Sequence, residues 1–463
     1  MSQDKQPLEI ELYESRKKIH PREVTGFFQT LRKLSLFGLL GLFYLIPWFD
    51  FQGHQAILFD LPARKFHIFN ITFWPQDFIF LSWLLIIAAF LLFFFTALSG
   101  RLWCGFACPQ TVWTELFIKI EQWTEGNRSK RIKLDKAPWT FNKLRRRGLK
   151  NILWIALALW TGFTFVGFFT PIKELLQLVL TWSLGPWETF WIFFYGLATY
   201  GNAGFLREQV CLHMCPYARF QSAMFDKDTL IVSYNSKRGE PRQAGNKRRA
   251  KIDNVGDCIE CTLCVQVCPT GIDIRDGLQY ECIACAACID ACDAIMLKSG
   301  QPPGLISFTT ENELLGKKTH VLRPRIIVYG LVLSIMVGLF TYTLVNRKDI
   351  AVDIIRDRNS FYRIIDAQTL ENIYTLKIMN KGKVAQQYIV TATGIEGGLR
   401  VIVDKQFKDR ELAAGEVLSL PIKVRTKIAN IKQHIQNIEL QIKVIGEHGA
   451  TITEETKYFG PKK

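Results

Sequence analysis

Charge is missing from three long stretches of this sequence, and cysteine is missing from everything beyond Cys292. The uncharged stretches are residues 78–99, 151–172 and 326–346. A helix needs about 18–20 apolar residues to cross the hydrocarbon core of a bilayer, and each of these stretches is longer than that. We therefore expect membrane-spanning helices. Residues 1–33 are polar and basic and lack the short apolar core of a secretory signal, so we expect no cleavable signal peptide.

Acidic residues are scarce relative to basic ones, with 42 Asp and Glu against 58 Lys and Arg. The basic residues collect before residues 34–49 and again between residues 78–99 and 151–172. In a membrane protein, Lys and Arg gather in the cytoplasmic loops. This distribution accounts for the net charge of +16 without a nucleic-acid partner, and it predicts that the N-terminus lies in the cytoplasm.

We expect about five transmembrane helices. Residues 189–206 form a fourth apolar stretch, and residues 34–49 form a shorter one that is also compatible with a buried or interfacial helix. Five crossings from a cytoplasmic N-terminus place everything after Asn346 outside the inner membrane, which in a Gram-negative cell is the periplasm. Residues 53–78 mix aromatic with polar residues, and residues 175–187 are apolar but too short to cross a membrane. We therefore expect interfacial or re-entrant segments there.

Two histidines, His54 and His67, lie among the aromatic residues of 53–78. Imidazole is a common metal ligand, but a histidine beside aromatic rings more often only completes hydrogen bonds. The sequence favours the second role and leaves metal binding as the alternative.

Two cysteine runs carry the most specific motif. "CIECTLCVQVCP" begins at Cys258 and "CIACAACIDAC" at Cys282, and both follow the C-x2-C-x2-C-x3-C spacing of bacterial two-cluster ferredoxins, in which the fourth cysteine of each run ligates the other cluster. One 4Fe-4S cluster would therefore take Cys258, Cys261, Cys264 and Cys292, and the other Cys282, Cys285, Cys288 and Cys268. A pair of zinc knuckles is the alternative, since thiolates also bind zinc. In such ferredoxins a proline usually follows the fourth cysteine of each run. Pro269 does so in the first run, but Asp293 takes that position in the second.

The other four cysteines form two CxxxCP boxes, "WCGFACPQTVW" and "CLHMCPYARFQ". Cys104 and Cys108 follow the second expected span, and Cys211 and Cys215 follow the fourth. Both pairs therefore belong at the cytoplasmic face, and helical i, i+4 spacing predicts that each presents two sulfurs to one point. Together with His213 and Met214 they would form a soft site for copper or another metal, or a dithiol relay. The alternative is that these cysteines are buried packing residues.

The domain organisation follows from these features. Residues 1–33 form a cytoplasmic segment, 34–230 a membrane domain with four spans and the boxes, 231–325 an inserted cytoplasmic 2x4Fe-4S ferredoxin domain, and 326–346 a fifth span. Residues 347–463 contain short alternating runs such as "IYTLKIMN" and "IELQIKVIG", which predict an antiparallel, immunoglobulin-like β-sandwich. The fold class is thus an α+β multidomain membrane protein.

The loop "LFDLPARKFHIF", the two boxes and the ferredoxin run resemble the CcoG/FixG/RdxA cytochrome oxidase accessory proteins over nearly the whole chain. The resemblance implies an oxidoreductase, a cupric reductase that makes Cu(I) for the cbb-type cytochrome c oxidase, with Cys104, Cys108, Cys211 and Cys215 as its site. It implies copper as substrate and, besides membrane lipid, a cytoplasmic electron donor and a copper chaperone or oxidase assembly factors as partners. The NapH/NosR type shares the boxes, so a quinol-linked electron conduit is the alternative, and a pure assembly scaffold is a third. Association into a homo-oligomer stays open.

Overall fold

The structure is a computed structural model that describes residues 18–51, 53–242, 255–347, 350–357, 360–382, 384–407, 410–445 and 451–461. The chain divides into two compact units, Met1–Gly338 and Leu339–Lys463, and the boundary falls within helix α15 (Pro324–Val345). Arg16 and Lys17, two of the basic residues expected before the first span, lie outside the described residues.

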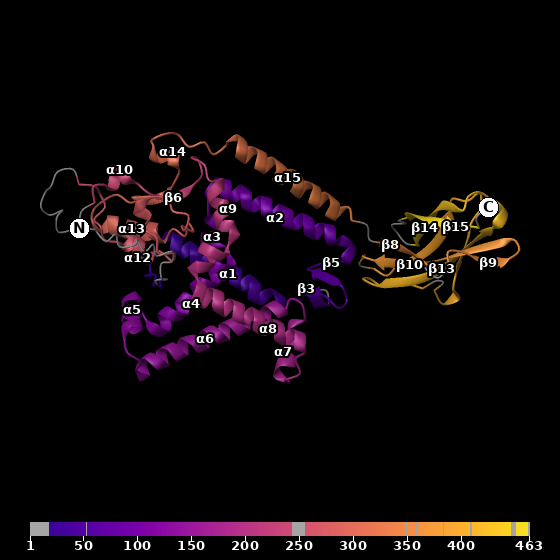
Figure 1. Cartoon of the computed structure of the whole chain (residues 1–463), viewed down its shortest axis with the longest axis horizontal. Coiled ribbons are helices and arrows are strands. Elements are labelled where there is room, and N and C mark those ends of the chain that lie inside the picture. Colours follow the sequence, from indigo (N-terminus) through magenta and orange to yellow (C-terminus); the bar gives the residue numbers. More distant parts are fainter. Residues whose placement is uncertain are drawn as a thin grey trace, which may run out of the picture. The chain divides into compact units, whose positions relative to one another are not determined.

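The first unit contains most of the apolar helices (Figure 1). Four helices among the described residues are long and apolar enough to cross a membrane: Phe27–Trp48, which joins α1 (Phe27–Leu45) to η1 (Ile46–Trp48), α2 (Phe78–Ser99), α6 (Phe141–Val166) and α15. The expected fourth span consists of α8 (Pro186–Thr199) and the π-helix η3 (Tyr200–Leu206), and α8 alone has 14 residues.

The third expected span is shifted. Helix α6 begins at Phe141, earlier than residues 151–172 predict, and ends at Val166. Its N-terminal turns contain the basic residues that were expected in the preceding loop, because Thr140 caps the helix by accepting a hydrogen bond from the Lys143 amide. Beyond Pro171, the chain starts the separate helix α7 (Ile172–Leu180).

Helix α2 is apolar on all sides, and the only residues that it buries within the protein are Thr96 and Ala97, near its C-terminal end. Large side chains such as Leu85, 62% exposed, face outward along it, and Leu331 of α15 is 60% exposed. A helix that is apolar on every face needs an apolar environment around it. These helices therefore indicate a membrane protein.

The segment before α2, expected to be interfacial or re-entrant, folds into small antiparallel sheets. Strands β1 (Asp50–Phe51) and β2 (His54–Gln55) pair, and β3 (Ile57–Asp60), β4 (Lys65–Ile68) and β5 (Ile71–Phe73) form a second sheet in chain order, followed by η2 (Pro75–Asp77). The buried Gln55 side chain anchors this region, since its Nε2 donates to Gly167 O and its Oε1 accepts from Ile172 N.

The cysteine-rich part of the first unit is framed by the pair β6 (Ile231–Tyr234) and β7 (Ile306–Thr309). Between and beside these strands lie α10 (Ser236–Gly239), α12 (Leu263–Val267), η5 (Ile274–Asp276), α13 (Ala287–Lys298) and α14 (Glu311–Leu314). Asp290 of α13 accepts hydrogen bonds from the Phe28 and Gln29 amides at the first turn of α1. Since the free amides of a helix start need acceptors, this carboxylate caps α1 from another domain and ties the cysteine-rich part to the membrane helices.

The second unit is a β-sandwich. Its larger sheet has the order β12-β13-β10-β8, with β9 also on β10, and its smaller sheet has the order β11-β14-β15. The strands are β8 (Ile350–Arg356), β9 (Arg363–Asp366), β10 (Thr369–Asn380), β11 (Gln387–Thr393), β12 (Arg400–Val403), β13 (Val417–Lys427), β14 (Ile435–Ile445) and β15 (Thr451–Phe459). The run "IYTLKIMN" lies in β10, and residues 438–445 of "IELQIKVIG" lie in β14, so these strand predictions are confirmed.

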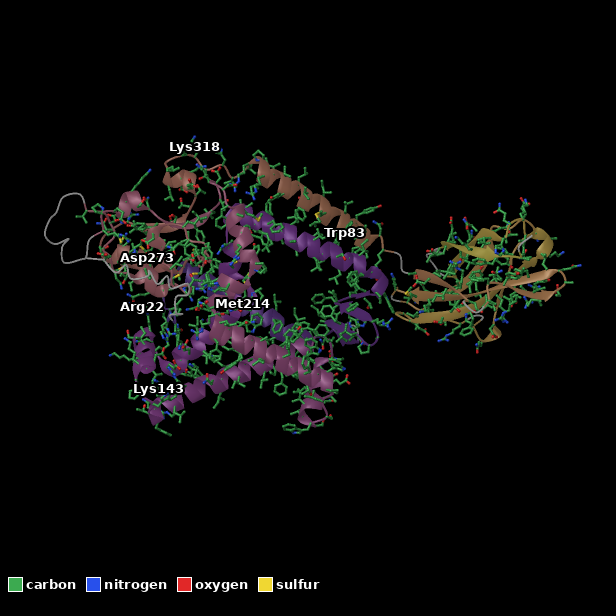
Figure 2. The ribbon with its side chains drawn as sticks, in the orientation of Figure 1. Arg22, Trp83, Lys143, Met214, Asp273 and Lys318 are labelled. Atoms are coloured by element: carbon green, nitrogen blue, oxygen red, sulfur yellow. The ribbon has the colours of Figure 1, made fainter. Side chains whose placement is uncertain are left out.

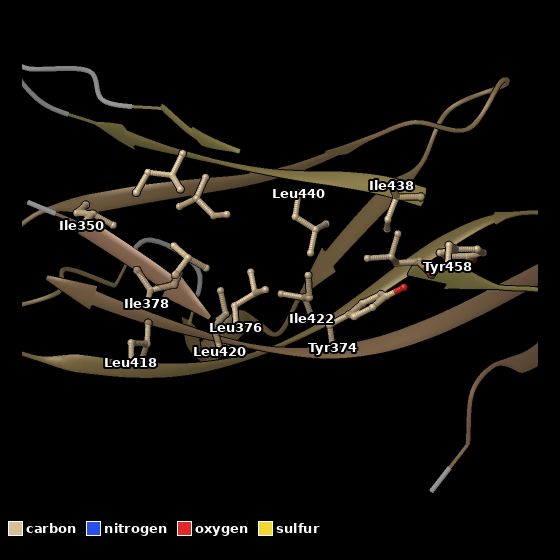
Figure 3. Close-up of a cluster of buried hydrophobic side chains, with 14 of the residues drawn as sticks. Ile350, Tyr374, Leu376, Ile378, Leu418, Leu420, Ile422, Ile438, Leu440 and Tyr458 are labelled. Atoms are coloured by element: carbon tan, nitrogen blue, oxygen red, sulfur yellow. Dashed lines mark hydrogen bonds between the residues drawn. The ribbon is translucent and has the colours of Figure 1, made fainter. Parts of the chain in front are cut away.

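Alternating side chains from the two sheets fill the core of the sandwich (Figure 3). Leu376 and Leu420 of the larger sheet and Leu440 of the smaller one are fully buried. The buried Tyr458 hydroxyl donates to Leu370 O at 3.0 Å, so its polar atom is satisfied and links the sheets.

Candidate iron–sulfur and thiol sites

The first predicted set of ferredoxin cysteines surrounds a single cavity. Cys258, Cys261, Cys264 and Cys292 all line it, together with apolar side chains and Arg275. Cys292 comes from α13, in the second cysteine run, while the other three come from the first run. The geometry thus brings together the cysteines that the crossed ferredoxin spacing assigns to one cluster.

The second set surrounds a neighbouring cavity. Cys268, Cys282, Cys285 and Cys288 line it, and Cys264 borders it as well. Here Cys268 is the residue that crosses over from the first run. The exchange of the fourth cysteine is therefore reciprocal, and one side chain, Cys264, lies between the two cavities.

Both cysteine loops have the same unusual backbone. Glu260 and Thr262 in the first loop have φ values of 53° and 56°, and Ala284 and Ala286 at the matching positions of the second have 52° and 59°. A left-handed conformation is uncommon for residues other than glycine, and it persists where the surrounding structure requires it. Turns of this kind make concave sites that bind anions, which suits a negatively charged thiolate cluster.

The chemistry of the donors also fits a cluster. Burial raises the pKa of the Cys282 and Cys292 thiols to about 12, so these thiols keep their protons until a metal displaces them. Among the described residues, no three His, Cys, Asp or Glu side chains converge closely enough to hold one metal ion. Four sulfurs spread around a cavity suit a multi-iron cluster better than a zinc knuckle, whose four ligands meet at one ion. Ligation by these eight cysteines stays a prediction.

The first CxxxCP box lies across a break between two helices. Cys104 is in α3 (Leu102–Phe106), whereas Cys108 has an extended backbone, with ψ of 128°, and is the N-cap of α4 (Pro109–Glu125). The helical i, i+4 arrangement expected from the sequence is therefore wrong for this pair. Pro109 is the first residue of the new helix, where the absence of an amide hydrogen costs nothing.

The second box repeats this arrangement with a different first helix. Cys211 lies in the π-helix η4 (Val210–Met214), Cys215 is extended, and Pro216 begins α9 (Pro216–Met224). The two residues between the cysteines that were expected to assist them, His213 and Met214, are exposed, and Met214 is labelled in Figure 2. In the described contacts neither side chain meets a thiol.

The boxes pack against each other. The Cys104 thiol donates to Gln221 Oε1 of α9, at an Sγ–Oε1 distance of 3.4 Å. Gln110 Nε2 of α4 donates to Asn202 O and Arg207 O, which precede the second box. Burial, with a smaller contribution from Cys108, raises the pKa of Cys104 to about 12.

Burial and neighbouring thiols also raise the pKa values of Cys108 and Cys211. Burial raises the pKa of Cys211 to about 11, with contributions from Cys108 and Cys215. Burial also raises the pKa of Cys108, and Cys215 adds to that rise. Each of Cys104, Cys108 and Cys211 is thus close enough to another box thiol for that thiol to affect its pKa, but no three of the four converge on one ion, so the expected four-sulfur site stays a prediction.

The first box also contacts the second cluster cavity. Cys104 packs against the hydrophobic cluster formed by Val267, Ile283, Cys285, Ala287 and Ala291. A Cβ on Gly105 would come within 2.8 Å of Ile283 O and Ala284 O, so only glycine permits this approach of α3 to the cysteine loop.

Arg101 lies buried at the same junction. Its guanidinium donates to the carbonyl oxygens of Tyr280 and Cys282 in the cysteine loop and of Ala218 in α9. Arg101 therefore joins the cysteine loop to the second box. Neither Arg101 nor Gly105 was predicted as a site residue, although both lie within three residues of Cys104, because only the tertiary contacts reveal their positions.

Comparison with known proteins decides the family. The chain is 38% identical to the nitrogen fixation protein FixG of Rhizobium meliloti over 83% of its own length and 80% of that protein. It is 39% identical to protein RdxB of Cereibacter sphaeroides, with 82% and 83% covered, and 36% identical to protein RdxA of the same organism, with 85% and 86% covered. The chain belongs to the FixG/RdxA family.

Three family models match parts of this FixG/RdxA chain. Residues 206–311 match a 4Fe-4S dicluster domain, and residues 81–131 match a 4Fe-4S binding domain. Residues 340–461 match the IG-like fold at the C-terminus of FixG, which is described as a putative oxidoreductase, so the immunoglobulin-like class is confirmed. A crystal structure of a FixG-related protein from Vibrio parahaemolyticus aligns at 26% identity and a TM-score of 0.22, covering 25% of this chain and 98% of that one. Family and domains together indicate an iron–sulfur electron-transfer protein.

Proposed function

We propose that this FixG/RdxA protein is an inner-membrane oxidoreductase that reduces Cu(II) to Cu(I) for the copper site of a cbb-type cytochrome c oxidase. The contact between the first CxxxCP box and the second cysteine loop supports this proposal most directly. Cys104 and Gly105 pack against Ile283 and its neighbours in that loop. Electron transfer becomes rapidly slower with distance. Because of this contact, we expect electrons to pass from the cysteine-rich domain to the boxes.

The eight ferredoxin cysteines would hold two 4Fe-4S clusters, which would supply one-electron transfer when bound, and a cytoplasmic protein is the expected electron donor. The protein contributes position and electrostatics. Burial raises the pKa of the Cys282, Cys104 and Cys211 thiols, and the buried Arg101 cation beside them offsets part of that rise.

The box thiols bind the copper substrate. Cu(II) accepts one electron and leaves as Cu(I), and the thiols release their protons when the metal binds. Thiolates prefer the softer, reduced ion, so the ligands favour the product of the step. A copper chaperone or an oxidase assembly factor is the expected acceptor, because free Cu(I) has to be passed to another soft ligand.

Sidedness is the second part of the proposal. The ferredoxin part and both boxes belong in the cytoplasm, and the C-terminal sandwich belongs in the periplasm, because basic residues cluster before α1 and again between the first box and α6. The Asp290 cap on α1 supports a common location for the N-terminus of α1 and the ferredoxin part. A reporter fused after Asn346 should be active only in the periplasm, whereas one fused after Lys298 should be active only in the cytoplasm.

One observation favours a second role for the first box. The 4Fe-4S binding model matched by residues 81–131 includes Cys104 and Cys108. In that case the box cysteines help to hold a cluster, and the protein is a quinol-linked conduit of the NapH/NosR type without a metal substrate.

The deciding experiment measures iron, cluster EPR and Cu(I) formation on one set of variants. Reduced protein is mixed with Cu(II), and Cu(I) is detected with a chelator in Cys104→Ser, Cys108→Ser, Cys211→Ser and Cys215→Ser. We expect copper reduction to be lost while iron content and cluster EPR are unchanged. Loss of iron along with activity supports the cluster-holding role, quinol-driven reduction of the clusters without copper turnover supports the conduit, and full activity in all four variants contradicts both roles for the boxes.

A further inference from the structure

His54 and His67 come together in the small sheets that precede α2. Their ring centroids lie 4.3 Å apart, and the ring planes are tilted by 31°. His54 is on β2 and His67 is in the middle of β4, so separate strands supply the two rings. The sequence favoured a hydrogen-bonding role for these histidines, with metal binding as the alternative, and it did not predict that they form a pair.

Both rings are held through the same nitrogen. His54 Nδ1 lies 3.0 Å from Gln55 O, and His67 Nδ1 lies 3.0 Å from Thr72 Oγ1. A carbonyl oxygen only accepts, so the neutral form of His54 carries its proton on Nδ1 and keeps the lone pair of Nε2 for a metal ion. In the part of the chain that the structure describes, no hydrogen bond is found at either Nε2. This is the pattern of metal-binding histidines, whose second nitrogen is oriented by a carbonyl or another polar group.

The spacing of the rings suits a shared ion. A metal bound at about 2.0–2.1 Å from Nε2 lies about 3.2 Å from the ring centroid. Two centroids 4.3 Å apart then subtend an angle of about 85° at the ion. This angle matches adjacent positions in square-planar or octahedral coordination, which Cu(II) and Ni(II) adopt, better than tetrahedral coordination.

The platform under the pair is rigid. The side chain of Gln55, next to His54, is buried and makes three hydrogen bonds, to Ile57 O, Gly167 O and Ile172 N. Strand β4 is paired on both sides, with His67 opposite Leu58 in β3 and Thr72 in β5. Both rings are half-buried, so a metal ion can reach them from solvent.

We propose that His54 and His67 bind one divalent transition-metal ion through Nε2, with Cu(II) bound most tightly, as the order of affinities for nitrogen ligands predicts. Two protein ligands leave the other positions to water, which permits exchange of the ion. The site precedes the N-terminus of α2, whereas the first box follows its C-terminus, and the 22 residues of α2 separate them by about 33 Å along the helix. The inference therefore goes beyond the proposed function and holds whether or not the boxes reduce copper.

The test is a Cu(II) titration followed by EPR, which detects nitrogen ligands through their hyperfine coupling. The full-length protein carries serine at all four box positions, so that thiols do not compete. We expect one bound Cu(II) with imidazole coupling, and at least about a tenfold weaker affinity without that signal in His54→Gln and His67→Gln. His434→Gln is the matched control, because His434 Nδ1 also contacts a backbone carbonyl, Gly460 O.

Unchanged affinity and spectrum in both His54→Gln and His67→Gln overturns the proposal. Iron content reports whether the variants have folded. A measurement on the unsubstituted protein covers the case of misfolding: Cu(II) should protect His54 and His67, but not His434, from diethyl pyrocarbonate, as mapped by mass spectrometry. Equal modification of all three with and without Cu(II) also overturns it.

Discussion

The Cys104 thiol and the Gln221 amide join the two CxxxCP boxes, with Sγ 3.4 Å from Oε1 across 117 positions of sequence. The Gln221 side chain is fully buried, so this contact is shielded from water. A buried polar group that loses its partner destabilises its surroundings, and this contact therefore holds the two boxes in one arrangement. If the boxes act on copper as a unit, Gln221 positions the thiols without binding the metal.

Gln221→Leu tests this role. The substitution keeps the size of the side chain but removes the acceptor, so Cys104 loses its position relative to the second box. We expect copper reduction to slow by roughly tenfold, which corresponds to about 1.4 kcal/mol in the barrier, with iron content unchanged. Gln209→Leu is the control, because it makes the same change near the second box, while the Gln209 amide donates to its neighbour Glu208 and not to a cysteine. Equal rates in the two variants argue against a positioning role.

The crossed cysteine sets predict the metal content. Protein purified without oxygen should contain about eight irons per chain, as two four-iron clusters. Cys268→Ser should damage the cluster of the second run, because Cys268 lines the cavity formed by Cys282, Cys285 and Cys288. EPR of the reduced protein distinguishes the two clusters. Stoichiometric zinc without sulfide contradicts the iron–sulfur assignment, and about twelve irons indicate that the boxes hold a third cluster.

A buried ion cluster stabilises the junction of α4, α5 (Arg128–Lys136) and η3. Glu121 of α4 is fully buried and pairs with Arg207 at 2.8 Å, Lys18 at 3.3 Å and Arg131 at 3.4 Å. Burial acts to raise the pKa of Glu121, but Arg207, Lys18 and Arg131 outweigh it and lower the pKa to about 2. Glu121 is therefore charged at neutral pH and compensates two buried cations.

Glu121→Gln should therefore destabilise the protein strongly. It leaves Arg131 and Arg207 buried without their counter-ion, which costs about 3–5 kcal/mol when one partner of a buried pair is removed. Glu311→Gln is the control, because Glu311 pairs with Lys227 at the surface, where the loss is about 0–1 kcal/mol. Thermal unfolding in detergent at pH 7 measures both. A small effect of Glu121→Gln means that water or another group compensates the cations.

The sequence predicted local features well where one pattern determines them. Alternation along β10 and β14 predicted the sandwich, and the spacing of the cysteine runs predicted which cysteines share each cavity. It failed where the backbone changes direction within a motif. Nothing in the spacing of Cys104 and Cys108 shows that α3 ends between them, because proline at the start of a helix and proline that ends one look alike in sequence.

The sequence also did not predict the contacts between segments that are far apart in the chain. His54 and His67 are paired by the register of small sheets whose strands have two to four residues, too short for a periodic signal. The Asp290 cap on α1 joins residues more than 260 positions apart and has no local signature. The start of α6 was missed because basic residues were assigned to a loop, although Lys and Arg are good helix formers.

Gly105→Ala tests whether the contact between the first box and the second cysteine loop matters for function. The added Cβ meets the backbone oxygens of Ile283 and Ala284 at 2.8 Å, and backbone cannot move aside as a flexible side chain can. We expect α3 to shift away from the loop. Because the box would then lie farther from the reduced cysteine-rich domain, Cu(I) formation should slow while the iron content remains about eight per chain.

Gly148→Ala in α6 is the matched control for this substitution. Nothing lies within 4 Å of a Cβ at Gly148, so alanine fits there and slightly favours the helix. Stopped-flow mixing of reduced protein with Cu(II) gives the rate for each variant, and metal analysis gives the iron content. A rate for Gly105→Ala equal to that of Gly148→Ala would mean that electrons leave the cysteine-rich domain elsewhere. Loss of iron only in Gly105→Ala would mean that α3 supports the cysteine loop rather than receiving electrons from it.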